Sequence, residues 1–132
     1  MSTLQVSNLN DGTTTVPTTF VNSGSAKAWG SIDQDSTDHP TYDSFNVSGT
    51  VDDNLGNTVV SFTNSMGNAD YAIAGAGQAD GEDAGFFAVT GKSGAGNDTK
   101  MSASAFVTDN RTAASASRDL RYMAFTIHGD LA

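Results

Sequence analysis

An acidic run, Asp33-x-Asp35-x-x-Asp38, is the first group in this chain that could do chemistry, as ligands for a divalent cation. A calcium-binding loop takes oxygen ligands at positions 1, 3 and 5, a glycine at position 6 and a bidentate carboxylate at position 12. Counted from Asp33, the sixth residue is Asp38 and the twelfth is Ser44, so both defining positions differ. We expect a solvated acidic loop, with weak cation binding as the alternative, and no bound metal or other cofactor. The second acidic group, 80–83, has the same interpretation.

Gly91-Lys92-Ser93 has the ending of a phosphate-binding loop, in which four residues separate an earlier glycine from Gly-Lys-Ser/Thr. The earlier glycine here is Gly85, which lies one position too far away, and the residues between, 86–90, predict a strand. The glycine-rich residues after Ser93 do not favour the helix that such a loop requires. We therefore expect no nucleotide binding.

The sequence also contains no recognisable set of catalytic residues. The chain has two histidines, His39 and His128, and no cysteine, which leaves too few ligands for a zinc site and no thiolate nucleophile. No Gly-x-Ser-x-Gly nucleophile motif occurs. Fifteen acidic residues offer many carboxylate pairs for glycoside hydrolysis, but nothing selects one pair. We predict that the protein is not an enzyme.

Length and charge narrow the class of protein. The 132 residues suit one domain, and a formal net charge of −9 repels nucleic-acid phosphates and anionic lipids. No apolar run approaches the roughly 18 residues of a membrane span, and the first residues lack the features of a signal peptide. Hydrophobic residues make up 37%, which predicts a thin core or one shared with copies of the chain. We expect synthesis in the cytosol, with neither nucleic-acid binding nor membrane insertion.

Alternating apolar and polar residues predict strands over most of the chain. In the last of them Met123, Phe125 and Ile127 face one way, and the polar turn 52–57 predicts a hairpin between two earlier strands. Residues 112–120 lack an apolar helical stripe and predict a loop. The fold class is therefore all-β, an antiparallel β-sandwich of the jelly-roll type over residues 26–132. The predicted strands are 45–51, 60–62, 71–75, 86–89, 101–107 and 122–128.

Residues 1–25 differ from the rest and predict an extended N-terminal arm. The stretch is Thr-rich, and Pro17 cannot donate a hydrogen bond within a central strand. Such an arm would dock on another chain by strand addition, and the alternative is an edge strand of its own domain. The candidate docking residues are its large apolar side chains, Leu4, Val6, Leu9, Val16 and Phe20.

Four ordered motifs resemble a module common in tailed-phage virion proteins, especially the tail fibres of marine phages. The motifs are Gly12–Trp29 (ending Ala-Lys-Ala-Trp), Tyr42–Ser48, Val60–Asn64 and Asn68–Ile73. The resemblance implies a β-rich head and a homotrimer. The chain departs from the pattern after Trp29, where Gly30-Ser31-Ile32 replaces the usual residues and an acidic insert precedes Tyr42.

The resemblance further implies a structural protein of the virion, made in the cytoplasm of a bacterial host. The short chain favours a trimeric capsid decoration (cement) protein that docks on the major capsid protein and stabilises the shell. The alternative is a receptor-binding head of a tail fibre or baseplate, whose loops 33–43 and 77–85 and residue Tyr71 contact a host surface glycan. The candidate exposed contact residues are Asp33, Asp35, Asp38, His39 and Tyr42.

Overall fold

The computed structural model describes residues 3–79, 84–89, 101–112 and 114–132. The strands of one sheet are β10 (Arg111–Thr112), β8 (Ala84–Phe86), β7 (Ala72–Gln78), β11 (Tyr122–His128), β3 (Ala28–Ile32) and β4 (Thr41–Phe45). Those of another are β5 (Val47–Asn54), β6 (Asn57–Phe62) and β9 (Ala105–Val107). Within the described residues, the six strands and the three strands pair in these orders.

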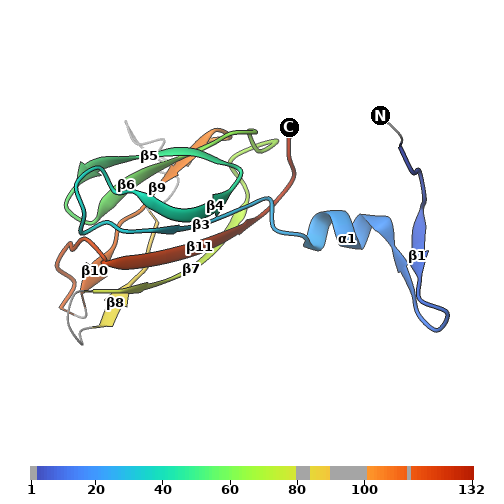
Figure 1. The fold of residues 1–132 in the computed structure, drawn as a ribbon, viewed down its shortest axis with the longest axis horizontal. Coiled ribbons are helices and arrows are strands. Elements are labelled where there is room, and N and C mark those ends of the chain that lie inside the picture. The colour runs from blue at the N-terminus through green and yellow to red at the C-terminus, as the bar shows by residue number, and fades with distance from the viewer. Residues whose placement is uncertain (1–2, 80–83, 90–100, 113) are drawn as a thin grey trace.

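The two sheets lie face to face, with the smaller one covering part of the larger (Figure 1). Every named pairing within them is antiparallel, so the predicted antiparallel β-sandwich is confirmed. The finer jelly-roll connectivity stays a prediction. In the described part of the chain no helix is long and apolar enough to cross a membrane.

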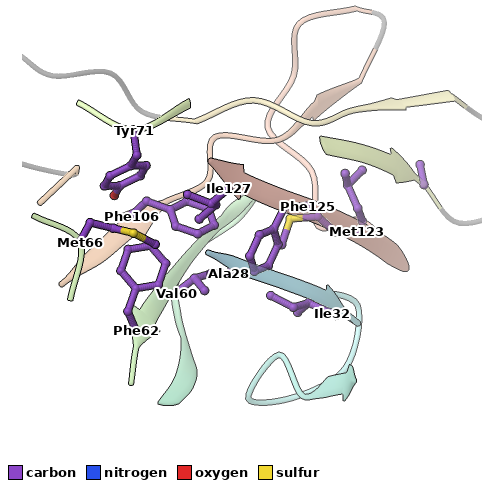
Figure 2. Close-up of a cluster of buried hydrophobic side chains, with 12 residues drawn as sticks. Ala28, Ile32, Val60, Phe62, Met66, Tyr71, Phe106, Met123, Phe125 and Ile127 are labelled. Atoms are coloured by element: carbon purple, nitrogen blue, oxygen red, sulfur yellow. The ribbon is translucent and has the colours of Figure 1, made fainter. Parts of the chain in front are cut away.

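The core forms between β11 of the larger sheet and β6 and β9 of the smaller (Figure 2). The prediction for β11 is confirmed, because Met123, Phe125 and Ile127 are all buried on its inner face. Phe106 of β9 meets Phe125 edge to face, with ring centroids 5.1 Å apart. Such pairs add about 0.5–1.5 kcal/mol beyond the area that they bury. The core thus joins the two sheets through aromatic contacts.

The predicted strand 45–51 is wrong in one respect, because the chain leaves one sheet and enters the other at Asn46. Asn46 has a left-handed backbone with φ of 57°, which asparagine tolerates better than most residues. Its side chain donates to the carbonyls of Lys27 and Asn64 at 3.0 Å each, and accepts from the Asn64 amide at 2.7 Å. These bonds hold the corner between β4 and β5.

Two other predicted strands are shorter than expected. The strand over 101–107 is reduced to β9, and Met101 forms only an isolated bridge with Phe106. The strand over 86–89 ends at Phe86, and Val89 forms an isolated bridge with Thr108. The hairpin of β5 and β6 is confirmed, but its turn is shorter than the predicted 52–57, because β5 runs to Asn54 and β6 begins at Asn57.

Glycines in β7 and β8 make room for a large side chain on the inner face of the sheet. Gly77 and Gly85 pair across the two strands, and fully buried Leu120 lies over both. A Cβ atom on either glycine would overlap the Leu120 side chain. The glycine-rich sequence of β7 therefore serves core packing by a residue outside the strands.

A buried polar cluster centred on Gln34 connects the loop after β3 to the smaller sheet. The Gln34 amide nitrogen donates to Thr58 Oγ1 at 2.6 Å and to Thr108 Oγ1 at 3.2 Å. Its oxygen accepts from Asn110 Nδ2 at 2.6 Å and from the Leu120 amide at 3.1 Å. All four hydrogen bonds of the Gln34 side chain are buried. A buried polar network whose groups are all hydrogen-bonded favours one arrangement of the segments that it connects.

Replacing Gln34 with leucine tests how much this cluster contributes to the free energy of unfolding. Gln34→Leu keeps most of the volume but removes the oxygen acceptor of the Asn110 side chain and of the Leu120 amide. Because each unsatisfied buried donor costs about 1–3 kcal/mol, we expect the free energy of unfolding to fall by about 2–5 kcal/mol in urea denaturation. The exposed neighbour Asp35, changed to Asn, should stay within about 0.5 kcal/mol. Equal stability of Gln34→Leu and wild type would show that the cluster contributes nothing.

The N-terminal arm has secondary structure of its own. It contains the strands β1 (Asn8–Asn10) and β2 (Thr15–Pro17), which form a separate two-stranded sheet, and the helix α1 (Thr18–Gly24). The expectation of a wholly extended arm is therefore wrong for residues 18–24. Three β-branched residues (Thr18, Thr19 and Val21) are poor helix formers, which explains why the sequence pattern does not predict this helix.

Candidate functional site

The hairpin at the tip of the arm is held by local hydrogen bonds. Asp11 Oδ1 accepts from the amides of Thr13 at 2.9 Å and Thr14 at 2.7 Å, an Asx-type turn. The hydrogen bonds from the Thr14 and Thr13 amides hold the pKa of Asp11 below its usual value. Gly12 completes the turn with φ of 97°, a conformation that favours glycine. The turn pairs Leu9 with Val16 across the hairpin.

Helix α1 is tied to the hairpin at its start. The Thr18 amide donates to the Ser7 carbonyl at 2.9 Å, and the Thr18 hydroxyl lies 3.1 Å from the carbonyls of Val6 and Ser7. None of the seven residues of α1, all of them described, is buried. The arm is thus a small preformed unit with no core of its own.

All five predicted docking residues of the arm are exposed. Phe20 is 72% exposed and Leu4 is 83% exposed, and Val6, Leu9 and Val16 also face solvent. Leu9, Val16 and Val21 line a shallow hollow between the hairpin and the helix. Figure 1 shows the arm projecting away from the sandwich. Clustered exposed apolar side chains are typical of a surface that contacts another molecule.

The alternative of an edge strand in the chain's own domain is wrong. Within the described residues, β1 and β2 pair with each other and with neither sheet of the sandwich. The base of the arm is nevertheless fixed to the sandwich by Lys27, which is buried. Lys27 Nζ donates to the Asn22 carbonyl and to Ser25 Oγ, and the Lys27 amide donates to the Ile127 carbonyl at 2.8 Å.

Strand register places a second candidate surface at the end of the sheet opposite to the arm. Ala28, next to the arm, pairs with Ile127, whereas Ile32, four residues further on, pairs with Met123. Tyr122 therefore begins β11 at the far end, where it pairs with Gln78, the last residue of β7. We call this the distal end.

The acidic loop after β3 lies at the distal end, and one of its predicted contact residues is misplaced. Asp35, Asp38 and Tyr42 are exposed and Asp33 is half-buried, whereas His39 is only 2% exposed. The prediction that His39 is an exposed contact residue is therefore wrong. Its Nδ1 lies 2.6 Å from Thr58 Oγ1, within the cluster around Gln34.

A local turn carries His39 inward. Asp38 and His39 both have left-handed backbone conformations, with φ of 69° and 46°. The His39 amide donates to the Ser36 carbonyl at 3.1 Å, and Nε2 lies 3.7 Å from Asp52 Oδ1. Two successive left-handed residues break the alternation of side chains, so a pattern of polar residues cannot show which of them points inward.

Two tyrosines and a carboxylate form the centre of the distal end. Tyr42 Oη donates to Asp33 Oδ2 at 2.8 Å, and Ser36 Oγ donates to the same oxygen at 2.8 Å. The rings of Tyr42 and Tyr122 stack with centroids 6.4 Å apart and planes inclined by 24°. Tyr42 is 61% exposed and Tyr122 is 46% exposed, so both rings offer a face to solvent.

The contact between Tyr42 and Asp33 changes the titration of both groups. Loss of solvent around Asp33 raises the pKa of its carboxyl, but hydrogen bonds from Tyr42, Ser36 and the Asp35 and Ser36 amides outweigh this, and the pKa is lowered. The hydrogen bond to Asp33 raises the pKa of Tyr42. At neutral pH the pair is a carboxylate accepting from a neutral phenol.

These rings form one wall of a hollow of about 480 Å³, which Gln78, Ala79 and Arg121 complete. A volume of about 300–1,000 Å³ is usual for sites that take small ligands. Tyr71, which we expected to contact glycan, is a core residue: it is 6% exposed, and its hydroxyl donates to the carbonyls of Ser102 and Ala105 at 3.0 Å. Tyr122 takes its place, and no local pattern in the sequence pairs it with Tyr42.

The remaining features considered in the sequence are a metal site, the acidic group 80–83 and the glycine-rich motif at 91–93. Across the described residues, no three His, Asp or Glu side chains gather as a group that could hold a metal ion. The acidic group 80–83, part of the predicted contact loop 77–85, and the motif Gly91-Lys92-Ser93 lie outside the described residues. No protein-family model, curated protein or solved structure matches this chain.

Removing the Tyr42 hydroxyl should raise the pKa of Asp33. Tyr42→Phe keeps the ring but removes a hydrogen bond that favours the charged carboxylate, so the Asp33 carboxyl should titrate at higher pH in carbon-detected NMR. Tyr122→Phe removes the hydroxyl of the other ring, for which no bond to Asp33 is seen, and should leave the Asp33 titration unchanged. A carboxyl pKa that is lowered in the folded state stabilises the fold at pH values above the pKa of the unfolded chain, which is near 3.9, and this stabilisation is lost as the pH falls. Because Tyr42→Phe reduces the shift of the Asp33 pKa, the variant should also lose less stability on acidification below about pH 4. An unchanged Asp33 titration would contradict the role given to Tyr42.

Proposed function

We propose that this chain is a non-enzymatic structural protein of a tailed-phage virion, a capsid decoration (cement) protein that docks on the major capsid protein through its N-terminal arm. The observation that carries the proposal is the arm itself, which projects from the sandwich with Leu4, Leu9 and Phe20 exposed. The phage setting rests on the resemblance of the four motifs. The arm supplies the physical means of attachment.

The energetics suit stable docking. Burying one large apolar side chain contributes about 1.5–3 kcal/mol, and the arm carries five such predicted contact residues. The hairpin and α1 are already formed, so docking need not order the whole segment, which lowers the entropic cost of binding. Strand β1 also offers an unpaired edge for strand addition within the described arm.

Charge is distributed in a way that favours the arm as the docking segment. Asp11 is the only charged side chain in residues 1–25, whereas the rest of the chain carries nearly all of the net charge of −9. Approach of the sandwich to another acidic surface is opposed by repulsion, but approach of the arm is not. The arm can therefore bind a shell on which many copies of the acidic sandwich lie close together.

Binding to virions should depend on the apolar side chains of the arm. Phe20→Asp combined with Leu9→Asp places charge in the proposed contact and should reduce occupancy on stripped phage particles at least tenfold, since burying one unpaired charge alone costs more than about 1.4 kcal/mol. Occupancy is measured by mass spectrometry of purified particles, and circular dichroism checks the fold. Val51→Asp, on the exposed face of the sandwich, is the matched control.

The copy number in the same particles tests the shell assignment. A cement protein should be present in hundreds of copies per virion, and a tail protein in a few dozen or fewer. Wild-type occupancy by the arm variant, or absence of the protein from phage particles, would refute the proposal.

The homotrimer belongs to this proposal and finds support on the outer face of the larger sheet. Trp29 and Phe45 pair across β3 and β4 and are both exposed, and Ala76 pairs with Ala124 across β7 and β11. A shallow hollow over β7 and β11 is lined by small or uncharged residues. On a chain with a net charge of −9, the uncharged strip of this face on β3, β7 and β11 is where a second copy meets little repulsion, and exposed Asp43 on β4 lies at its edge.

A charge on this strip should prevent trimer formation. Trp29→Glu buries an acid in the proposed contact, so light scattering coupled to size exclusion should give the mass of a monomer where wild type gives a trimer. Val51→Glu, on β5 of the smaller sheet, should leave the trimer intact. A monomeric wild-type protein, or a trimeric Trp29→Glu variant, would contradict this placement.

A receptor-binding head of a tail fibre or baseplate is the second candidate function. The favouring observation is the hollow at the distal end, which lies opposite to the arm in the register of β3 and β11. A chain held by its arm would present that end to the surroundings, where it could contact a host surface glycan. The copy number distinguishes this role from decoration of the shell.

A further inference from the structure

We propose that the distal hollow is a carbohydrate-binding subsite, in which the Tyr42 and Tyr122 rings receive the C–H face of a pyranose and Gln78 and Arg121 contact its hydroxyl groups. The four side chains come from three segments of the chain and line one hollow of about 480 Å³. The biological ligand rests on the second candidate function. The binding itself belongs to the isolated chain.

The aromatic wall is the first argument. Side chains that are large, flat and half exposed are costly to leave in water, yet here two of them stack nearly parallel at 24° on one side of a hollow. A pyranose ring has one face of C–H groups and a rim of hydroxyls, so it can cover an aromatic face while its polar groups stay hydrogen-bonded. Planar aromatic side chains give such contact area at low entropic cost, because they have only two rotatable bonds.

The wall is also held in place. Tyr42 Oη donates to Asp33 Oδ2, and Asp33 is itself fixed by Ser36 Oγ and by the amide of Asp35 at 3.1 Å. The register of β3 and β4 shifts between Ser31 and Ile32, which pair with Asp43 and Thr41, so Tyr42 is the residue of β4 that the shift passes over. A ring that is positioned before the ligand arrives loses less entropy on binding.

The polar lining selects the ligand class. Gln78 offers both a donor and an acceptor, which match a pair of vicinal hydroxyls, and the planar guanidinium of Arg121 lines the same hollow. A phosphate or nucleotide would meet the Asp33 carboxylate near the wall and the net charge of −9. A cation would meet the guanidinium of Arg121, and a wholly apolar ligand would leave the polar groups of the lining uncovered. An uncharged polyhydroxylated ring satisfies each of these constraints.

The test uses the full chain, labelled with ¹⁵N and titrated with methyl glycosides of glucose, galactose and mannose and with N-acetylglucosamine. Each is added to about 50 mM, which detects dissociation constants on the order of millimolar. We expect at least one pyranoside to shift the amides around Tyr42, Gln78 and Tyr122. Glycerol, a polyol without a ring, should not shift them.

Variants then distinguish binding at the aromatic wall from nonspecific binding elsewhere on the protein. Tyr122→Ala should weaken binding about tenfold, because it removes half of the ring surface, and Tyr42→Phe should weaken it about threefold through loss of the tether to Asp33. Phe86→Ala removes another exposed aromatic ring, on β8, and should leave the affinity unchanged.

No pyranoside shift at the hollow, equal shifts with glycerol, or wild-type affinity in Tyr122→Ala would each overturn the proposal. These measurements need no virion, so failure of the arm to bind capsids leaves the subsite standing. Equally, a chain that docks on capsids but binds no pyranoside refutes the subsite alone.

Discussion

The pairing of β11 with β3 on one side and β7 on the other is the constraint on which the other surfaces depend. Because side chains alternate along a strand, one register decides which residues of β11 enter the core and which face outward. Phe125 packs on Phe106, while Ala124 lies on the outer strip. The same register places Tyr122 at the distal end and Ile127 beside the arm. A shift by one residue would exchange the core and the outer face together.

A core with few apolar residues needs other ways to fix its segments. Hydrophobic residues are 37% of the chain, and the structure uses a satisfied polar cluster where a richer sequence would place aliphatic side chains. Gln34, Thr58 and Asn110 are all fully or almost fully buried, and hydrogen bonds link Gln34 to the other two. Such a cluster adds less net stability than packing of the same volume, but it tolerates only one arrangement. It holds the loop between β3 and β4, the strand that carries Tyr42, so the geometry of the distal end depends on it.

What the sequence could predict follows from the range of the interactions involved. The limits of β11 and its buried face agree with the alternation of residues 122–128, and the hairpin of β5 and β6 follows from a polar turn. Both signals are local. The sequence does not indicate the corner at Asn46, because the alternation of residues continues across it while the backbone changes sheets through a single left-handed residue. The sequence does not predict helix α1, because its β-branched residues disfavour a helical backbone. The hydrogen bond from the Thr18 amide to the Ser7 carbonyl supports the start of that helix in the folded chain.

The distal hollow could not be predicted for a different reason. Tyr42, Gln78 and Tyr122 are far apart in the chain, and the register of the four strands β7, β11, β3 and β4 brings them together. Each residue alone is an ordinary surface side chain. Tyr71 was the other tyrosine expected to contact a glycan, but the bonds of its hydroxyl to the carbonyls of Ser102 and Ala105 keep it in the core. Burial of this kind depends on tertiary packing, which no spacing rule expresses.

The distribution of charge links the two ends of the molecule. A net charge of −9 opposes contact between sandwiches, and that repulsion acts over about 8–10 Å at physiological salt. Segments with little charge are therefore where contact costs least, and among the described residues these include the arm, whose one charged side chain is Asp11, and the outer strip around Ala124. The acidic loop with Asp35 and Asp38 lies instead at the distal end, beside the hollow. In the proposed assembly, repulsion would keep the distal ends of neighbouring copies apart while the arm and the outer strip make the contacts, and the hollow would stay open to a ligand that carries no charge.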